Sequence, residues 1–137
     1  MTNFSNMDSV SKEDYLRAIF LVLETSSEAR SIDVASELGV SKPSVSTMLR
    51  KLHKEGLIEA APYQKIKLTA KGRRLAQKLT TRHRVIEVFL KDVLGYKKDV
   101  HQEAHLLEHA FSDESIRRLK KYLHNPQYCP HGKRIPR

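Results

Sequence analysis

Histidine and glutamate side chains gather in the C-terminal half of the sequence at spacings that suit a divalent metal ion. Four of the seven histidines lie between residues 83 and 109. In two segments expected to be helical, imidazole and carboxylate groups recur three or four residues apart, which places them on one helical face. These groups belong to His83, Glu87, His101, His105, Glu108 and His109. Neutral imidazole and carboxylate are ligands of first-row divalent metals, so the pattern predicts a metal site.

The same residues allow two other interpretations. The histidines could be structural groups at a helix interface, with the glutamates in solvent. They could also belong to a small metallohydrolase, although no residue is evidently a general base beside an open metal position. The sequence has neither an HExxH motif nor Cys-rich spacing, so it predicts neither a zinc protease nor a structural zinc finger.

Two neighbouring helices must position these groups. Apolar residues at helical spacing predict a long helix over residues 70–94 and a shorter one over 98–111, with Gly95 ending the first. Antiparallel helices joined there would bring the histidines and glutamates face to face. Ser112 then caps a last helix, which is expected to run to about residue 123.

The C-terminal segment differs from the helices before it. Pro and Gly interrupt residues 126–137, which predicts an extended tail. Cys129 and His131 are two residues apart and could add a soft ligand, but a loose tail rarely holds a metal alone. We therefore expect both residues to lie outside the metal site.

A second set of functional residues lies in the N-terminal half, in a helix-turn-helix pattern. Residues 32–57 have apolar positions spaced for two short helices, with Ala35 and Gly39 small where the helices cross and turn. Ser41 caps the second helix, and Pro43 is tolerated in its first turn. This helix exposes short polar and basic side chains suited to a DNA groove. They are Ser41, Lys42, Pro43, Ser44, Ser46, Thr47, Arg50 and Lys51.

The segments around this motif complete a winged helix. Ser11 and Asp14 form a capping box ahead of an amphipathic helix that runs to about residue 24. Residues 57–60 and 65–69 resemble strands and flank Pro62, which predicts a hairpin wing whose lysines could contact phosphate. The expected fold class is mainly α, in three parts: a winged helix-turn-helix DNA-binding domain over 1–72, a helical metal-sensing and dimerisation domain over 73–125, and the tail over 126–137.

Composition favours a nucleic-acid partner and an intracellular location. The 137 residues include 25 Lys and Arg against 16 Asp and Glu, and this net charge of +9 attracts polyanions. A single Cys excludes an internal disulfide framework and suits a reducing cytosol. No apolar run approaches the roughly 20 residues that span a bilayer, and the N-terminus carries no export signal. We expect a cytoplasmic protein with no membrane partner.

Several segments resemble the diphtheria toxin repressor family of metal-dependent repressors, which includes the manganese transport regulators. They are EDYLRAIF, the helix-turn-helix, GLI with the wing and LTAKGR, RHRVIEVFL, and HQEAHLLEHAFSDE. The resemblance covers residues 11 to about 123 and extends into the tail. It implies two metal sites: His83, Glu87 and His101 in one, and Asp14, His105, Glu108 and His109 in the other.

Three positions depart from the patterns of the relatives that this chain resembles. Iron-type members carry Met where this chain has Asp14 and Cys where it has His105. Manganese-type members carry Asp at the first position and Glu at the second, and Arg17 replaces their second N-terminal carboxylate. Because Asp14 supplies a hard oxygen and His105 a softer nitrogen, we expect a response to both Mn(II) and Fe(II), with a lean towards Mn(II).

The resemblance implies a metal-activated transcriptional repressor of metal-homeostasis genes, and not an enzyme. Its cofactor would be Mn(II) or Fe(II) at two sites per subunit, and its partners a second copy of the chain and a palindromic double-stranded operator. Phosphate contacts are expected from Lys42, Arg50 and Lys51. The positions that resemble the family's base-contacting residues are Ser41, Pro43, Ser44 and Thr47. The alternative is a winged-helix factor that senses a small molecule and uses its histidines structurally.

Overall fold

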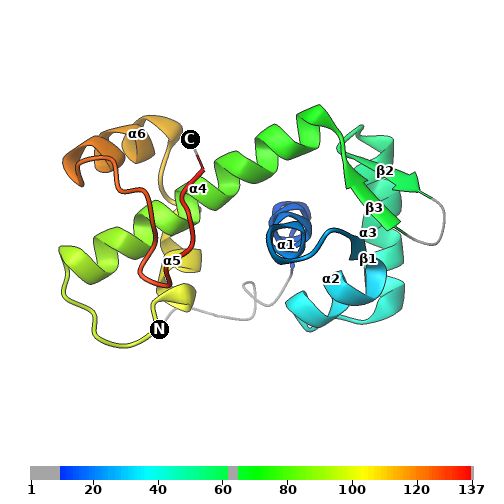
Figure 1. The fold of residues 1–137 in the computed structure, drawn as a ribbon, viewed down its shortest axis with the longest axis horizontal. Helices are drawn as coiled ribbons and strands as arrows, with labels where there is room; N and C mark the ends of the chain where they lie inside the picture. The colour runs from blue at the N-terminus through cyan, green and yellow to red at the C-terminus, as the bar shows by residue number, and fades with distance from the viewer. Residues whose placement is uncertain (1–9, 62–64, 137) are drawn as a thin grey trace. The chain divides into compact units, whose positions relative to one another are not determined.

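The structure is a computed structural model that describes residues 10–61 and 65–136 (Figure 1). The chain forms two compact units, Met1–Ala76 and Gln77–Arg137. Helices dominate both units and a small antiparallel sheet belongs to the first, which confirms the expected mainly α fold class. None of the helices in this described part of the chain is long and apolar enough to cross a membrane.

Three helices build the first unit: α1 (Lys12–Thr25), α2 (Ser31–Leu38) and α3 (Lys42–Lys54). α1 begins at the predicted capping box, in which the Asp14 N–H donates to Ser11 Oγ at 3.2 Å and the Ser11 N–H donates to Asp14 Oδ2 at 2.9 Å. The apolar stripes of the three helices are buried. Their fully buried side chains include Leu16, Ile19, Val34, Val45 and Leu52.

α2 and α3 form the predicted helix-turn-helix. α2 ends at Gly39, whose φ of 65° lies in the left-handed region that glycine adopts without a Cβ penalty. The Ser41 side chain then caps α3 by accepting the Ser44 N–H at 3.3 Å, and Pro43 occupies the first turn. Val45 packs inward, so the polar face of α3 stays in solvent.

Three strands form one antiparallel sheet in the order β1-β3-β2: β1 (Ala29–Arg30), β3 (Lys65–Leu68) and β2 (Ile58–Ala61). β2 and β3 are the predicted wing, with Ile58 opposite Leu68. The wing turn at residues 62–64 lies outside the described residues. Sequence analysis missed β1, because a strand of two residues has no alternating pattern to detect.

α4 (Ala70–Asp92) is one continuous helix that ends two residues before the predicted end. It starts where Thr69 Oγ1 accepts the Gly72 N–H at 3.0 Å. A Cβ on Gly72 would lie 1.9 Å from the carbonyl oxygen of Leu57, so this close approach requires glycine. α4 therefore begins against the end of the helix-turn-helix segment and continues into the second unit.

In the second unit, α5 (His101–Glu108) and α6 (Asp113–Tyr122) pack with the later turns of α4. Their shared apolar core comprises Ile86, Leu90, Val100, Ala104 and Ile116. α5 is shorter than the predicted helix over 98–111. It starts at His101, after Val100 at the N-cap position, and the Asp99 carboxylate accepts the His101 N–H at 3.0 Å. Ser112 caps α6, as predicted.

Residues 126–136 do not form the extended, separate tail that the sequence predicts. They fold back on themselves through a bridge between Tyr128 and Arg134. Ile135 is 3% exposed and packs against Val85 and Val88 of α4. The segment is a packed part of the second unit. Its few apolar residues, Tyr128, Cys129 and Ile135, lie among Pro and Gly and show no helical or strand period in the sequence.

Replacing Gly72 by alanine tests the close approach at the start of α4. We expect Gly72→Ala to destabilise the protein by about 1–3 kcal/mol, because the new Cβ must displace the Leu57 backbone. Urea unfolding followed by circular dichroism measures the change. Arg73→Ala is the matched control, since Arg73 is exposed on the same turn and should change stability by less than about 0.5 kcal/mol. Equal stability of the two variants would contradict the close-approach argument.

Candidate functional site

Three buried polar side chains lie at the centre of the α4–α5 contact. His83, Glu87 and Glu108 are 5%, 1% and 6% exposed. His83 Nδ1 lies 2.9 Å from Glu108 Oε2, and His83 Nε2 lies 3.6 Å from Glu87 Oε1. Buried carboxylates are costly unless a partner or a metal compensates their charge. The two helices therefore bring together the imidazole and carboxylate groups that the sequence predicted to converge.

One candidate metal group lies at the end of α5. His105 Nδ1 is 2.9 Å from Glu108 Oε1, and His109 Nε2 is 4.0 Å from the same oxygen. One ligand atom from each of these three residues lies within 4.8 Å of the others. The structure thus brings together three of the four residues expected in this site.

Asp14, the fourth expected ligand of that site, belongs to the first unit. Its Oδ2 accepts hydrogen bonds from the Ser11 N–H at 2.9 Å and from Ser11 Oγ at 3.0 Å. These contacts give the carboxylate a capping role at the start of α1. Its role as a metal ligand stays a prediction.

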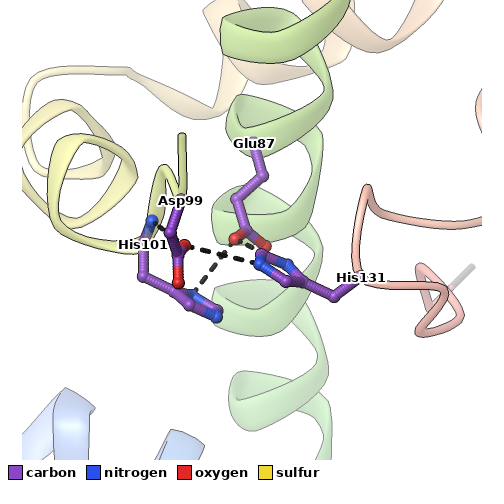
Figure 2. Close-up of side chains that lie close together, drawn as sticks. All are labelled: Glu87, Asp99, His101 and His131. Carbon is purple, nitrogen blue, oxygen red and sulfur yellow. Dashed lines mark hydrogen bonds and ion pairs between the residues drawn. The ribbon is translucent and has the colours of Figure 1, made fainter. Parts of the chain in front are cut away.

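A second candidate group surrounds the Glu87 carboxylate (Figure 2). Glu87 Oε2 lies 3.1 Å from His101 Nδ1 and 3.2 Å from His131 Nδ1. Asp99 Oδ1 lies 3.4 Å from His131 Nε2. His83 lies beside this group, with its Nε2 3.2 Å from His101 Nδ1.

Sequence analysis missed Asp99 and His131. Asp99 lies in the loop before α5, and His131 lies in the C-terminal segment that was expected to stay outside the site. Neither position has a helical spacing to the other donors, so only the folded chain brings them together. The backbone N–H of His101, followed by the His101 and His131 side chains, holds the pKa of Asp99 below its ordinary value.

The chemistry of both donor sets fits a first-row divalent metal. Imidazole and carboxylate suit Mn, Fe and Zn, and neither group contains the thiolates that favour softer ions. Metal–ligand bonds of about 2.1 Å place adjacent ligands of an octahedral ion about 3 Å apart. The separations of 3.1 and 3.2 Å from Glu87 Oε2 are close to that value.

The predicted DNA-contacting residues lie along α3 and its cap, and all eight are exposed. They are Ser41, Lys42, Pro43, Ser44, Ser46, Thr47, Arg50 and Lys51. The Thr47 hydroxyl donates to the Pro43 carbonyl at 3.0 Å, within the helix. On the wing, Lys65 pairs with Glu28 at 2.6 Å and holds the pKa of that carboxyl below its usual range, whereas Lys67 is exposed. Lys67 is therefore the more accessible of these two cations.

Two family models match the chain, one for each half. Residues 7–66 match the N-terminal DNA binding domain of the iron dependent repressors. Residues 69–137 match the metal binding and dimerisation domain of the same repressors. The boundary between the matches falls at the start of α4, near the division between the two compact units.

Individual relatives agree with the family models. The transcriptional regulator MntR of Escherichia coli O157:H7 is 40% identical over 105 residues, which are 76% of this chain and 67% of MntR. The iron-dependent repressor IdeR of Mycobacterium tuberculosis (strain ATCC 25618 / H37Rv) is 38% identical over 125 residues, which are 90% of this chain and 54% of IdeR. The chain thus spans little more than half the length of IdeR.

Among solved structures, a manganese-dependent transcriptional repressor in complex with manganese has a TM-score of 0.84 and 38% identity, covering 93% of this chain and 59% of that one. Sequence and fold agree over both units of the chain. The chain belongs to the iron-dependent repressor family, the diphtheria toxin repressor group of metal-dependent transcriptional regulators.

Proposed function

We propose that this protein is a cytoplasmic transcriptional repressor that senses Mn(II) or Fe(II) and controls metal-homeostasis genes. The observation that carries the proposal is the pair of imidazole–carboxylate groups in the second unit of a chain that also contains a winged helix-turn-helix. IdeR is an iron-dependent repressor, and a structural neighbour is a manganese-dependent repressor. These relatives support Mn(II) and Fe(II) as the two candidate metals.

Each chain would hold two metal ions. His83, Glu87 and His101 would bind one ion. The other would take its ligands from His105, Glu108, His109 and Asp14. The charge of the bound ions would compensate the buried carboxylates of Glu87 and Glu108. Because Asp14 belongs to α1 and the other ligands to α4, α5 and the C-cap residue of α5, metal occupancy would couple the DNA-binding unit to the sensing unit.

Activation requires only that metal binds the DNA-competent conformation more tightly than the other conformations. Metal then shifts the population towards that state, and DNA by linkage raises the affinity for metal. A homodimer formed by the second unit would hold two α3 helices at the spacing of a palindromic operator, about 34 Å or a multiple of it. The second unit matches a dimerisation domain, which supports this arrangement.

The exposed side chains of α3 would make two kinds of contact with the operator, to phosphates and to base edges. Lys42, Arg50 and Lys51 would contact phosphates and set the position of the helix. The base edges would be read by Ser41, Pro43, Ser44 and Thr47. This is a binding function, and we assign no catalytic residue to the protein.

Glu108→Gln tests the metal dependence of DNA binding. An operator is first selected from random DNA with the Mn(II)-loaded protein, and its affinity is then measured by fluorescence anisotropy with Mn(II), Fe(II) or a chelator. We expect Glu108→Gln to weaken metal-dependent binding by at least about tenfold, because Glu108 contacts both His83 and His105. Glu103→Gln on the same helix should behave like the wild type. Equal operator binding by the wild type with and without metal would favour the small-molecule sensor instead.

Arg50→Ala tests the phosphate contacts of α3. Arg50 is exposed on the recognition helix, so its loss should weaken binding to all DNA sequences alike and lower the salt slope of the binding constant by about one unit. Thr47→Ala is the comparison variant, since it should change preference mainly at one base position and keep the salt slope. An unchanged slope in Arg50→Ala would remove Arg50 from the phosphate-binding set.

Asp14→Met tests the expected preference for Mn(II) over Fe(II) in activation. The softer thioether should move the ratio of activating Mn(II) and Fe(II) concentrations towards iron while metal-free DNA binding stays weak. Ser11→Ala is the control, because it breaks the same capping box, at a cost of about 1 kcal/mol, but keeps the Asp14 carboxylate. If both variants kept the wild-type metal ratio, Asp14 would be a helix cap and no ligand.

A further inference from the structure

The outward face of α6 carries a concentrated positive charge that neither the metal groups nor the recognition helix uses. We propose that this face is a second DNA-binding surface of the chain, which contacts phosphates of double-stranded DNA and reads no bases. The α6 surface consists of the exposed side chains of Arg117, Arg118, Lys121 and Tyr122. The inference rests on the proposed function, because it assumes that the first unit binds DNA.

α6 has one buried face and one exposed face. It packs on α4, where Ile116 belongs to the apolar core of the second unit and Leu119 packs against that core (Figure 1). Leu119 and Leu123 also pack against the cluster that Ile135 forms with two valines of α4. The apolar side chains of α6 are therefore used within its own unit, and the α6 surface remains in solvent.

The α6 surface has more positive charge than the acids beside it can neutralise. Glu114 Oε1 lies 2.8 Å from Arg118 Nε, and Glu114 Oε2 contacts the Arg117 guanidinium. One carboxylate thus faces two guanidiniums, and Lys121 adds a third cation. Asp113, the other acid at the start of α6, pairs instead with two cations of α4. The side chains of Arg117 and Arg118 are 72% and 79% exposed, so their charge is open to a partner.

Helix stability alone does not account for these cations. A lysine in the last turn, such as Lys121, is favourable beside the negative end of the helix dipole. Arg117 and Arg118 lie in the middle of α6, where that effect has fallen away. Like charges four residues apart, as in Arg117 and Lys121, destabilise a helix. A polyanion lying along the α6 surface would remove this repulsion.

The C-terminal hairpin, residues 127–135, adds further cations to the same unit. Tyr128 bridges to Arg134, and the Cys129 N–H donates to the Lys133 carbonyl at 2.8 Å. Cys129 and Ile135 point inward, so their neighbours Tyr128 and Arg134 are exposed. Over residues 113–136 there are six Lys or Arg against two Asp or Glu. The end of the described chain is therefore strongly basic.

The chemistry of the α6 surface fits a nucleic-acid backbone better than a second copy or a membrane. Two copies of this surface would repel each other through their like charges. A helix that lies on a membrane inserts an apolar face, whereas the apolar residues of α6 are packed within the second unit. Arg, Lys and Tyr side chains are common donors to DNA phosphates, and Tyr122, which is 69% exposed, follows Lys121 directly.

DNA that is already held by the first unit would favour this second contact. Phosphates near the α3 helix are then present at a high effective concentration, so contacts that are weak by themselves add to the affinity. The contact would also add to the salt dependence of binding, because each neutralised phosphate releases counterions. Salt dependence is therefore the property that a second DNA-binding surface must change.

Removing two charges from the α6 surface of the full chain tests the proposal. Arg118→Gln and Lys121→Gln are combined in one protein. Its affinity for the selected operator between long flanks is measured by fluorescence anisotropy with Mn(II) at several salt concentrations. We expect the salt slope of the binding constant to fall by about two units per bound chain, since about two phosphate contacts are lost. The affinity at about 0.1 M salt should fall by at least about fivefold.

A variant with Lys97→Gln and Lys98→Gln is the matched control. Both lysines are exposed in the same unit, so the control loses the same charge at another place and should keep the wild-type slope. A variant with Arg118→Lys and Lys121→Arg keeps both charges and should also keep the slope. Circular dichroism and thermal unfolding show whether each variant is folded. Arg117→Gln with Lys121→Gln carries the same expectation if the first pair fails to fold.

The outcomes separate this inference from the proposed function. Equal salt slopes in the α6 variant and the Lys97 and Lys98 control would overturn the second DNA-binding surface, while metal-dependent operator binding by the wild type would leave the proposed function standing. A wild type that binds no DNA at any metal concentration would overturn both. A loss of slope confined to the α6 variant, at an unchanged activating Mn(II) concentration, would support the surface as described.

A vesicle assay tests the membrane as the other possible partner of this surface. Sedimentation with vesicles of phosphatidylglycerol and phosphatidylcholine measures binding of the wild type and of the α6 variant. We expect the α6 variant to differ from the wild type on DNA and to match it on vesicles. Vesicle binding that is lost in the α6 variant, with an unchanged salt slope on DNA, would overturn the DNA assignment in favour of an anionic membrane.

Discussion

Two buried carboxylates set the main constraint on the second unit. Glu87 and Glu108 are almost fully buried, and an ionised carboxylate removed from water is costly unless nearby charges or hydrogen bonds compensate it. His83 contributes to both, because its Nδ1 lies 2.9 Å from Glu108 and its Nε2 lies 3.6 Å from Glu87. Moving one helix relative to the other would therefore leave a charge of the α4–α5 contact poorly compensated.

The buried carboxylates and the apolar core both favour the same packing of α5 against α4. On α4, Ile86 and Leu90 each lie three residues after His83 and Glu87. One stripe of the helix therefore packs in the apolar core, and the neighbouring stripe presents the candidate metal donors. Burial of Val100 against the apolar stripe also holds the start of α5 close to Glu87. Because α4 is one helix that begins at the helix-turn-helix, the element that carries the metal donors is also continuous with the DNA-binding unit.

Local patterns in the sequence were enough to predict most of the helical fold. The capping box at Ser11 and the caps at Ser41 and Ser112 are interactions within four residues, so they can be recognised without tertiary structure. The convergence of His105, Glu108 and His109 follows from one turn of a helix in the same way. The short strand β1 escaped prediction, since it exists only through its pairing with β3.

The sequence by itself determined the winged helix-turn-helix, the long α4 and the histidine–glutamate face, because each is encoded in helical periods, caps and turn residues that act over a few positions. Only the tertiary structure decided where residues 126–136 lie. Their position depends on single long-range contacts, such as Ile135 with Val85 and the Thr81 hydroxyl with the Pro136 carbonyl. Contacts of this kind leave no periodic trace in a sequence, and for that reason His131 beside Glu87 could be found only in the folded chain.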